Sequence, residues 1–142
     1  METSKLASMM ALPCEGNLDA VFHMFAFLKR KHNGVIVFDP TEPEIVINKF
    51  SHEDWSATPY GECKDAPEPR GIAFTMRAFL DSDHAGDMIT RRSRTGFLIF
   101  LNNAPIYWFF KKQGSCETSG FGSEFIAMKS CCEYARGLRY KL

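Results

Sequence analysis

Two apolar runs in the second half of the chain constrain the fold more than any other feature. Residues 96–101 read GFLIFL, residues 106–112 read IYWFFKK, and the residues between them are Asn-Asn-Ala-Pro. Asparagine and proline favour tight reversals, so the two runs are predicted to form an antiparallel strand pair. Because both runs are apolar at nearly every position, we expect a central sheet that is covered on both faces.

A third strand and a helix flank this pair. Residues 72–81 alternate between two faces, and Asp81 ends the run on the face that carries Arg77 and Phe79. Residues 119–137, SGFGSEFIAMKSCCEYARG, predict a helix that ends at Gly137. We expect its buried stripe to consist of Phe121, Phe125, Met128, Cys132 and Ala135. The second half is therefore predicted to be a three-strand antiparallel meander followed by a helix, a mixed α/β (α+β) arrangement.

The first half predicts a helix and a β-hairpin. A helix is expected over residues 17–34, with Asn17 as N-cap, an apolar stripe that includes Phe22 and Phe25, and Asn33-Gly34 as the stop. The hairpin would pair residues 35–38 with residues 45–50 around the turn residues DPTEPE. We expect three parts: 1–50 (helix and hairpin), a linker at 51–71 that is rich in proline, glycine and charge, and 72–142 (meander and helix).

The bulk composition limits the class of partner and the compartment. The chain has 17 basic and 17 acidic residues, so nucleic-acid binding would depend on local patches rather than on net charge. Its five cysteines include no C-x-x-C pair, which is typical of reduced thiols in a cytoplasmic or nuclear protein that is not secreted. No stretch is long and apolar enough to span a bilayer, so no membrane partner is expected.

The predicted third strand ends in an acidic cluster, DSDHAGD at residues 81–87. A solvated turn-forming loop is one interpretation, whereas an EF-hand loop is disfavoured because the bidentate glutamate at position twelve is missing. Glu124 falls on the flank of the predicted helix that carries Phe121 and Met128, so it is expected to point toward the sheet. A pair of carboxylates that converges there is typical of a magnesium site, although Glu124 could equally form an ion pair with Lys129 or an arginine.

Four segments, in this order and spacing, resemble the ribonuclease H domain of copia-type retrotransposon polyproteins: FLDSDHAGD, RRSRTGF, PIYWFFKKQ and SGFGSEFIAMKS. The usual family forms are D-x-D-W-A-G-D, R-R-S-T-S-G-Y, P-I-x-W-x-S-K-K-Q and S-S-T-E-A-E-Y-x-A. The segment EGNLDAVFHMFAFLKRKHNGVIVFDP is similar to the end of the reverse transcriptase region in the same polyproteins. The resemblance covers roughly residues 15–142 and implies a ribonuclease H-like fold, here truncated to its N-terminal part.

The resemblance also implies a metal-dependent endonuclease that cleaves the RNA strand of an RNA–DNA hybrid. Asp81 and Glu124 match the first two catalytic carboxylates, and Asp83 is expected to be an outer metal ligand, with Mg²⁺ or Mn²⁺ as cofactor. His84 replaces the usual tryptophan, and Gly122 replaces the first glutamate of the helix motif. Because two of the four expected ligands are present, we expect weak or no nuclease activity from this chain alone.

Basic residues next to this cluster are candidates for phosphate contacts, although they could equally serve only to solubilise strand ends. They are Arg91, Arg92, Arg94, Lys111 and Lys112. The expected partners are an RNA–DNA hybrid and either the rest of a polyprotein or a second copy of the chain. Two alternatives stay open: a non-catalytic remnant that acts as an interaction or oligomerisation module, and a general nucleic-acid binder.

Overall fold

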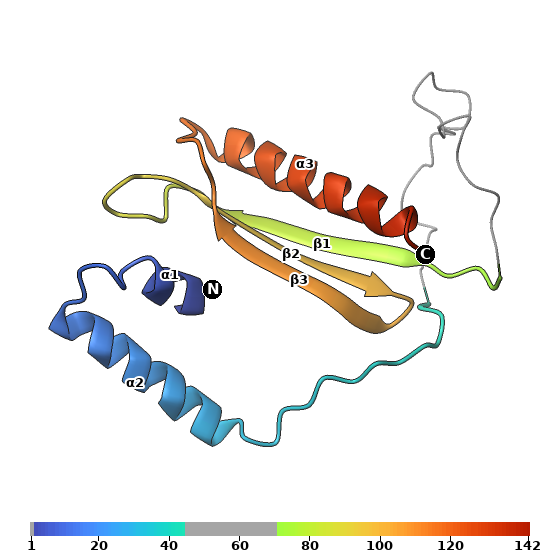
Figure 1. Ribbon diagram of the computed structural model, residues 1–142, viewed down its shortest axis with the longest axis horizontal. Coiled ribbons are helices and arrows are strands. Elements are labelled where there is room, and N and C mark those ends of the chain that lie inside the picture. The colour runs from blue at the N-terminus through green and yellow to red at the C-terminus, as the bar shows by residue number, and fades with distance from the viewer. Residues whose placement is uncertain (1, 45–70) are drawn as a thin grey trace.

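The computed structural model describes residues 2–44 and 71–142, which form three helices and three strands (Figure 1). The helices are α1 (Glu2–Ala7), α2 (Glu15–Arg30) and α3 (Gly120–Arg139), and the strands are β1 (Met76–Asp83), β2 (Arg94–Leu101) and β3 (Ala104–Lys112). The prediction of a mixed helix and strand fold with an antiparallel meander is confirmed: the sheet has the order β1-β2-β3, and both strand pairs are antiparallel.

The turn between β2 and β3 consists of Asn102 and Asn103, as the Asn-Asn-Ala-Pro sequence predicts. Asn102 has φ 52°, a left-handed conformation that asparagine tolerates better than most residues. Next to the turn, the register between β2 and β3 shifts between Ile99 and Phe100, and Phe100 pairs with Pro105. A proline fits here because β3 is an edge strand and Pro105 lies at an irregularity of the ladder, two settings in which a missing amide hydrogen is tolerated.

The same turn binds two segments that lie far from it in the sequence. Asn102 donates through Nδ2 to the Pro40 carbonyl at 2.8 Å, and its Oδ1 accepts from the Thr75 amide at 2.9 Å. Asn103 donates through Nδ2 to Thr41 Oγ1 at 3.0 Å. The extended segment after α2 and the segment that leads into β1 are thereby attached to one end of the sheet.

Helix α3 packs on one face of the sheet through small residues. Ser123, Ala127 and Cys131, at spacings of four, are its buried positions. The predicted stripe was wrong: Phe121 is 81% exposed, Phe125 is 54% exposed, and Met128 and Cys132 are also exposed, while Ala135 is half-buried. Small side chains let the helix approach the strands closely, which places the large apolar side chains on its outer flank.

The core lies between α3 and β2. Phe97 and Ile99 of β2 are buried against Cys131, and Phe109 stacks on Phe97 with 4.7 Å between ring centroids. Tyr134 of α3 contacts the same cluster, with its ring 5.4 Å from that of Phe97. This aromatic cluster fixes the C-terminal half of α3 on the sheet.

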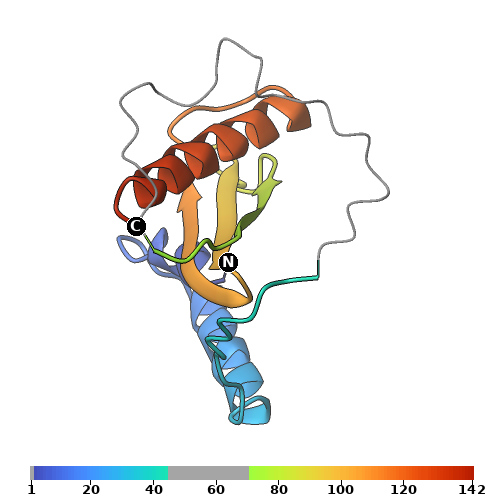
Figure 2. The same ribbon diagram turned by 90° about the vertical axis from the view of Figure 1, so that its right-hand side faces the viewer.

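The opposite face of the sheet is covered only at its Arg94 end, by α1, and is largely exposed elsewhere, so the prediction of cover on both faces holds for only a small part of the described sheet. Phe79 is 57% exposed and Trp108 is 61% exposed on that face, and Leu98 lies between them. Figures 1 and 2 show the single helix α3 along one side of the strands, with α2 projecting away from the sheet.

The N-terminal half departs from its prediction in three respects. Helix α2 begins at Glu15, and Asn17 is not the cap but its reciprocal partner: the Cys14 amide donates to Asn17 Oδ1 at 2.9 Å. Residues 35–38 form no strand, and the predicted second hairpin strand and linker, 45–50 and 51–70, lie outside the described residues. The apolar stripe of α2 is exposed, and the helix has no buried residue. No helix among residues 2–44 and 71–142 is long and apolar enough to cross a membrane.

Candidate metal and nucleic-acid site at the end of strand β1

Glu124 reaches the end of β1 from the first turns of α3. Ser119 caps this helix by accepting a hydrogen bond from the Gly122 amide at 3.1 Å. Glu124 Oε1 then accepts from the backbone amide of Ser82 at 3.3 Å, and Ser82 Oγ donates to Ser123 Oγ at 2.9 Å. Since the Ser82 amide donates to a side chain, it faces the free edge of β1, and Glu124 lies at that edge. The predicted direction of Glu124 is therefore correct although the predicted stripe is not.

Asp81 precedes Ser82 but belongs to the other face of the sheet. Its register partner is Gly96, and directly opposed residues in a sheet point to the same side. That side is the open one, where Asp81 lines a cavity of about 410 Å³ together with Phe79, Trp108 and Phe110. The two carboxylates thus end at the same short stretch of β1 but approach it from different sides.

Asp83 folds back into the loop that follows β1. A Cβ atom built on Gly86 would collide with the Asp83 carboxylate, so glycine is required for this close approach. The neighbouring His84 is exposed, with its Nδ1 at 3.5 Å from Ser93 Oγ, which also accepts a hydrogen bond from the Ala85 amide at 3.0 Å. The Asp83 carboxylate therefore lies against the backbone at Gly86, and its role as an outer ligand stays a prediction.

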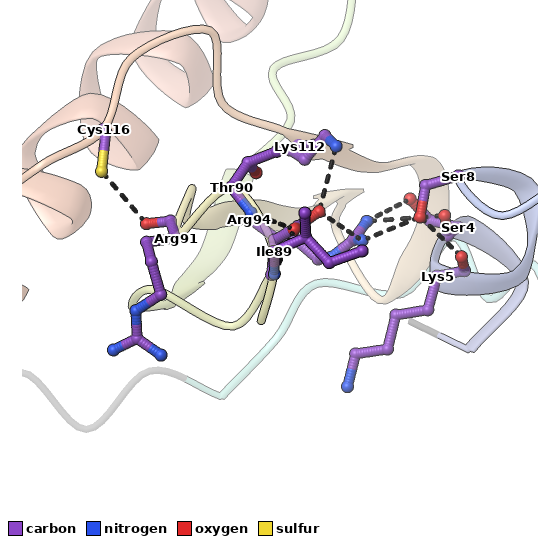
Figure 3. Close-up of polar contacts among 10 residues, drawn as sticks. Ser4, Lys5, Ser8, Ile89, Thr90, Arg91, Arg94, Lys112 and Cys116 are labelled. Atoms are coloured by element: carbon purple, nitrogen blue, oxygen red, sulfur yellow. Dashed lines mark hydrogen bonds and ion pairs between the residues drawn. The ribbon is translucent and has the colours of Figure 1, made fainter.

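Asp87 is the best-connected acid of the cluster, although no role was predicted for it. Figure 3 shows three of the residues that contact it, Thr90, Arg94 and Lys112. Its Oδ1 accepts from the Thr90 amide at 2.8 Å, and its Oδ2 lies 3.0 Å from Lys112 Nζ and 3.8 Å from Arg94 Nη2. The hydrogen bond from the Thr90 backbone, followed by that from Lys112, holds the pKa of Asp87 well below its ordinary value. The spacing Asp-x-x-Thr, in which a carboxylate binds the amide three residues later, was the available signal.

These contacts separate the predicted basic residues into two groups. Arg94 is only 2% exposed and donates to Ser4 Oγ at 3.1 Å and Ser8 Oγ at 3.2 Å, so it attaches α1 to the sheet. Lys112 is paired with Asp87. The structure therefore gives Arg94 and Lys112 structural partners, whereas Arg91, Arg92 and Lys111 are exposed.

The residues at the end of β1 do not form a closed metal site in the part of the chain that the structure describes. Within residues 2–44 and 71–142, no group of three or more His, Cys, Asp or Glu side chains is close enough to enclose a metal ion. Two carboxylates can still hold Mg²⁺, because this ion often keeps several waters and takes only one or two protein ligands. Asp81 and Glu124 supply two carboxylates that approach β1 from different sides, and no third Asp, Glu, His or Cys joins them within the described residues.

Comparison with known proteins yields two partial matches. No protein-family model matches the chain, and no solved structure matches it. It is 35% identical over 71 residues to secreted RxLR effector protein 161 of Plasmopara viticola, a match that covers 46% of this chain and 50% of that protein. It is 43% identical over 53 residues to the uncharacterized mitochondrial protein AtMg00810 of Arabidopsis thaliana, covering 37% of this chain and 22% of that protein. The chain thus spans half the length of the first relative and less than a quarter of the second.

Proposed function

We propose that this chain is part of a retrotransposon-derived ribonuclease H-like module in which Asp81 and Glu124 bind one divalent cation at the end of β1. The observation that carries the proposal is the hydrogen bond from the Ser82 amide to Glu124, at 3.3 Å. It joins the helix carboxylate of Glu124 to the strand segment that contains Asp81. Asp81 and Glu124 are 43 positions apart in the sequence. The partial identity with the mitochondrial protein is compatible with a retroelement origin.

The local chemistry supports Mg²⁺ or Mn²⁺ as the cation. Carboxylate oxygens are hard ligands, and both acids are exposed, so water and a phosphate oxygen can complete the coordination. A cation there would lower the pKa of a bound water and stabilise negative charge on a scissile phosphate. The proposed substrate class is the RNA–DNA hybrid, with Arg91, Arg92 and Lys111 as exposed phosphate contacts.

The test is a Mg²⁺ and Mn²⁺ titration followed by thermal unfolding and amide NMR. The amide shifts of the unmodified chain should saturate, and its free energy of unfolding should rise by about 2.7 kcal/mol at a metal concentration a hundred times Kd. Glu124→Gln and Asp81→Asn should each remove the response. Glu133→Gln is the matched control, because Glu133 is an exposed acid on the same helix, 3.7 Å from Lys129.

Two results would contradict this proposal. One is a chain that stays folded and ignores both metals. The other is a response that survives in both site variants, which would place the cation elsewhere. Hybrid cleavage in Mn²⁺ is a separate readout: we expect little turnover from this chain alone, and turnover that Asp81→Asn abolishes would show a more complete site than two carboxylates provide.

The alternative function is a non-catalytic interaction module. The observation that favours it is the amount of apolar surface left exposed on the open face of the sheet and on α2. Such a module would be indifferent to metal and would associate through those surfaces, so the titration also separates the two functions.

A further inference from the structure

Two apolar surfaces of this chain lack cover in the described residues. The first, the α2 stripe, consists of Leu18, Phe22 and Phe25, each more than half exposed and spaced to lie on one side of the helix. The second, the open sheet face, consists of Phe79, Leu98 and Trp108. An amphipathic helix and an apolar sheet face are complementary kinds of surface, since each buries its apolar side against the other.

The two surfaces do not cover each other within one chain. Helix α2 projects away from the strands in both views, and its half-buried side, which includes Ala20 and Met24, is distinct from the α2 stripe (Figures 1 and 2). The extended segment that follows α2 instead lines a second cavity of about 460 Å³ on the open sheet face itself, where Val35 and Val37 line it together with Leu98 and Trp108. This segment and the sheet form a groove whose floor is apolar.

The charged residues at the ends of the two surfaces are opposite in sign and similar in spacing. Arg77 and Asp81 lie on the open face, four residues apart on β1, which corresponds to about 13 Å. On α2, Asp19 flanks the stripe beside Leu18 and Lys29 continues it four residues after Phe25, and the ten-residue interval corresponds to about 15 Å. None of these four side chains forms an ion pair with a residue that the structure describes. Arg77 does donate through Nη2 to the Asn102 carbonyl at 2.9 Å and to Asn103 Oδ1 at 2.8 Å, which holds its charge at this end of the face.

We propose that this chain forms a homodimer in which the α2 stripe of each copy packs on the open sheet face of the other. With α2 parallel to β1 of the second copy, Asp19 meets Arg77 and Lys29 meets Asp81. The arrangement is reciprocal, so one two-fold axis covers both pairs of surfaces.

The available area suits such a dimer. A large aromatic side chain can bury 150–250 Å², so each of the four surfaces contributes roughly 300–400 Å² at the observed exposures. Together they approach the total of about 1,200–2,000 Å² that specific protein interfaces bury. The aromatic residues near the centre are the residue types that contribute most to binding.

Sedimentation velocity of the full chain over a concentration series, in EDTA to keep Asp81 free of metal, tests this dimer. We expect a monomer–dimer equilibrium whose dissociation constant rises at least about 30-fold in Phe22→Gln/Phe25→Gln. Trp108→Gln should weaken the dimer as well, with circular dichroism as the check on folding. Phe27→Gln is the matched control, because Phe27 is 56% exposed on the opposite side of α2 and should leave the dissociation constant unchanged.

A charge exchange tests the orientation. Lys29→Glu and Asp81→Lys should each weaken the dimer, and the two changes together should restore it. The proposal is overturned if the chain is a monomer at every concentration. If that monomer also loses thermal stability in the Phe22 and Phe25 variants, α2 packs on the sheet of its own chain instead. It is equally overturned by a dimer that Phe27→Gln weakens as much as Phe22→Gln/Phe25→Gln, or one that dissociates on changing Phe121 and Phe125.

Discussion

Asp87 Oδ2 lies 3.0 Å from Lys112 Nζ and joins the loop after β1 to the end of β3. The Asp87 side chain is only 12% exposed, and the Lys112 side chain is 30% exposed. The same carboxylate accepts the amides of Ile89 and Thr90, so it fixes the loop and the strand end together. Asp87, an acid of the 81–87 cluster, and Lys112, a predicted phosphate contact, therefore support the fold.

Asp87→Asn should lower the free energy of unfolding at neutral pH by about 2 kcal/mol, because the amide keeps the size of the side chain but loses charge-assisted hydrogen bonds. Urea unfolding followed by circular dichroism measures the change. Glu133→Gln, which breaks an exposed pair with Lys129, should change stability by less than about 0.5 kcal/mol. Equal effects of the two substitutions would show that the Asp87 contacts are no stronger than a surface ion pair.

The stability that Asp87 contributes should also depend on pH. Its pKa in the folded chain is lowered from an ordinary value of 3.8, so the unfolded chain takes up the proton first as the pH falls. The contribution is complete above about pH 4 and is lost progressively as the pH falls toward the folded-state pKa. The free energy of unfolding of the unmodified chain should therefore fall more steeply below pH 4 than that of Asp87→Asn. The same pH dependence in both proteins would contradict this assignment.

Ala127→Leu should lower the free energy of unfolding by about 2 kcal/mol. Ala127 is fully buried where α3 meets the sheet, so a larger side chain forces the helix away from the strands. Met128→Leu changes the next position, which is 45% exposed, and should have little effect. If Met128→Leu were the more harmful change, α3 would pack through its large apolar flank instead.

Gly86→Ala should destabilise the loop after β1, because the new Cβ atom would displace the Asp83 carboxylate. We expect a loss of about 1 kcal/mol, measured by chemical unfolding. In a double-mutant cycle, Asp83→Ala should remove much of that loss, since the smaller side chain leaves room for the methyl group. If the two losses of stability were strictly additive, the methyl group added at position 86 and the Asp83 carboxylate would not be in contact.

Tyr107 and Tyr134 stack with 5.1 Å between ring centroids, and a hydrogen bond from one to the other, aided by burial, raises the pKa of Tyr107. Because the folded-state pKa lies above the unfolded value of about 10, this contribution to stability is complete below pH 10 and is lost as the pH rises through the folded-state pKa. Tyr134→Phe should bring the Tyr107 titration, read from tyrosinate absorbance, to lower pH. Tyr140→Phe, at an exposed position, should not shift it.

The order of the strands and the direction of their side chains were predictable from sequence, whereas the packing of the helix was not. Two predicted bounds were wrong: β1 spans Met76–Asp83 rather than 72–81, and α3 continues past Gly137 to Arg139. Alternation in 72–81 correctly placed Asp81 with Arg77 and Phe79, because side-chain direction in a strand follows directly from position. The stripe of α3 was misassigned because hydrophobicity favours Phe121 and Phe125, whereas the contact with the sheet uses Ser123 and Ala127. Close approach, rather than apolar area, determined which side of this helix is buried.

The candidate site was predictable only in part, because charge in a sequence carries no information about partners. Glu124 reaches the end of β1 as expected. Arg94 looked like a surface phosphate contact, but its register beside Asp83 and its bonds to Ser4 and Ser8 bury it. Those bonds join residues about ninety positions apart, which local patterning cannot reveal.

The pair of asparagines between β2 and β3 limits which substitutions the chain can accept during evolution. The Asn102 side chain bonds both the Pro40 carbonyl and the Thr75 amide, and the Asn103 side chain bonds Thr41. One side chain thus fixes two segments that lie far apart in the sequence. A substitution that removes the Asn102 amide group would remove both of these side-chain hydrogen bonds in one mutational step, while Asn103 would still bind Thr41.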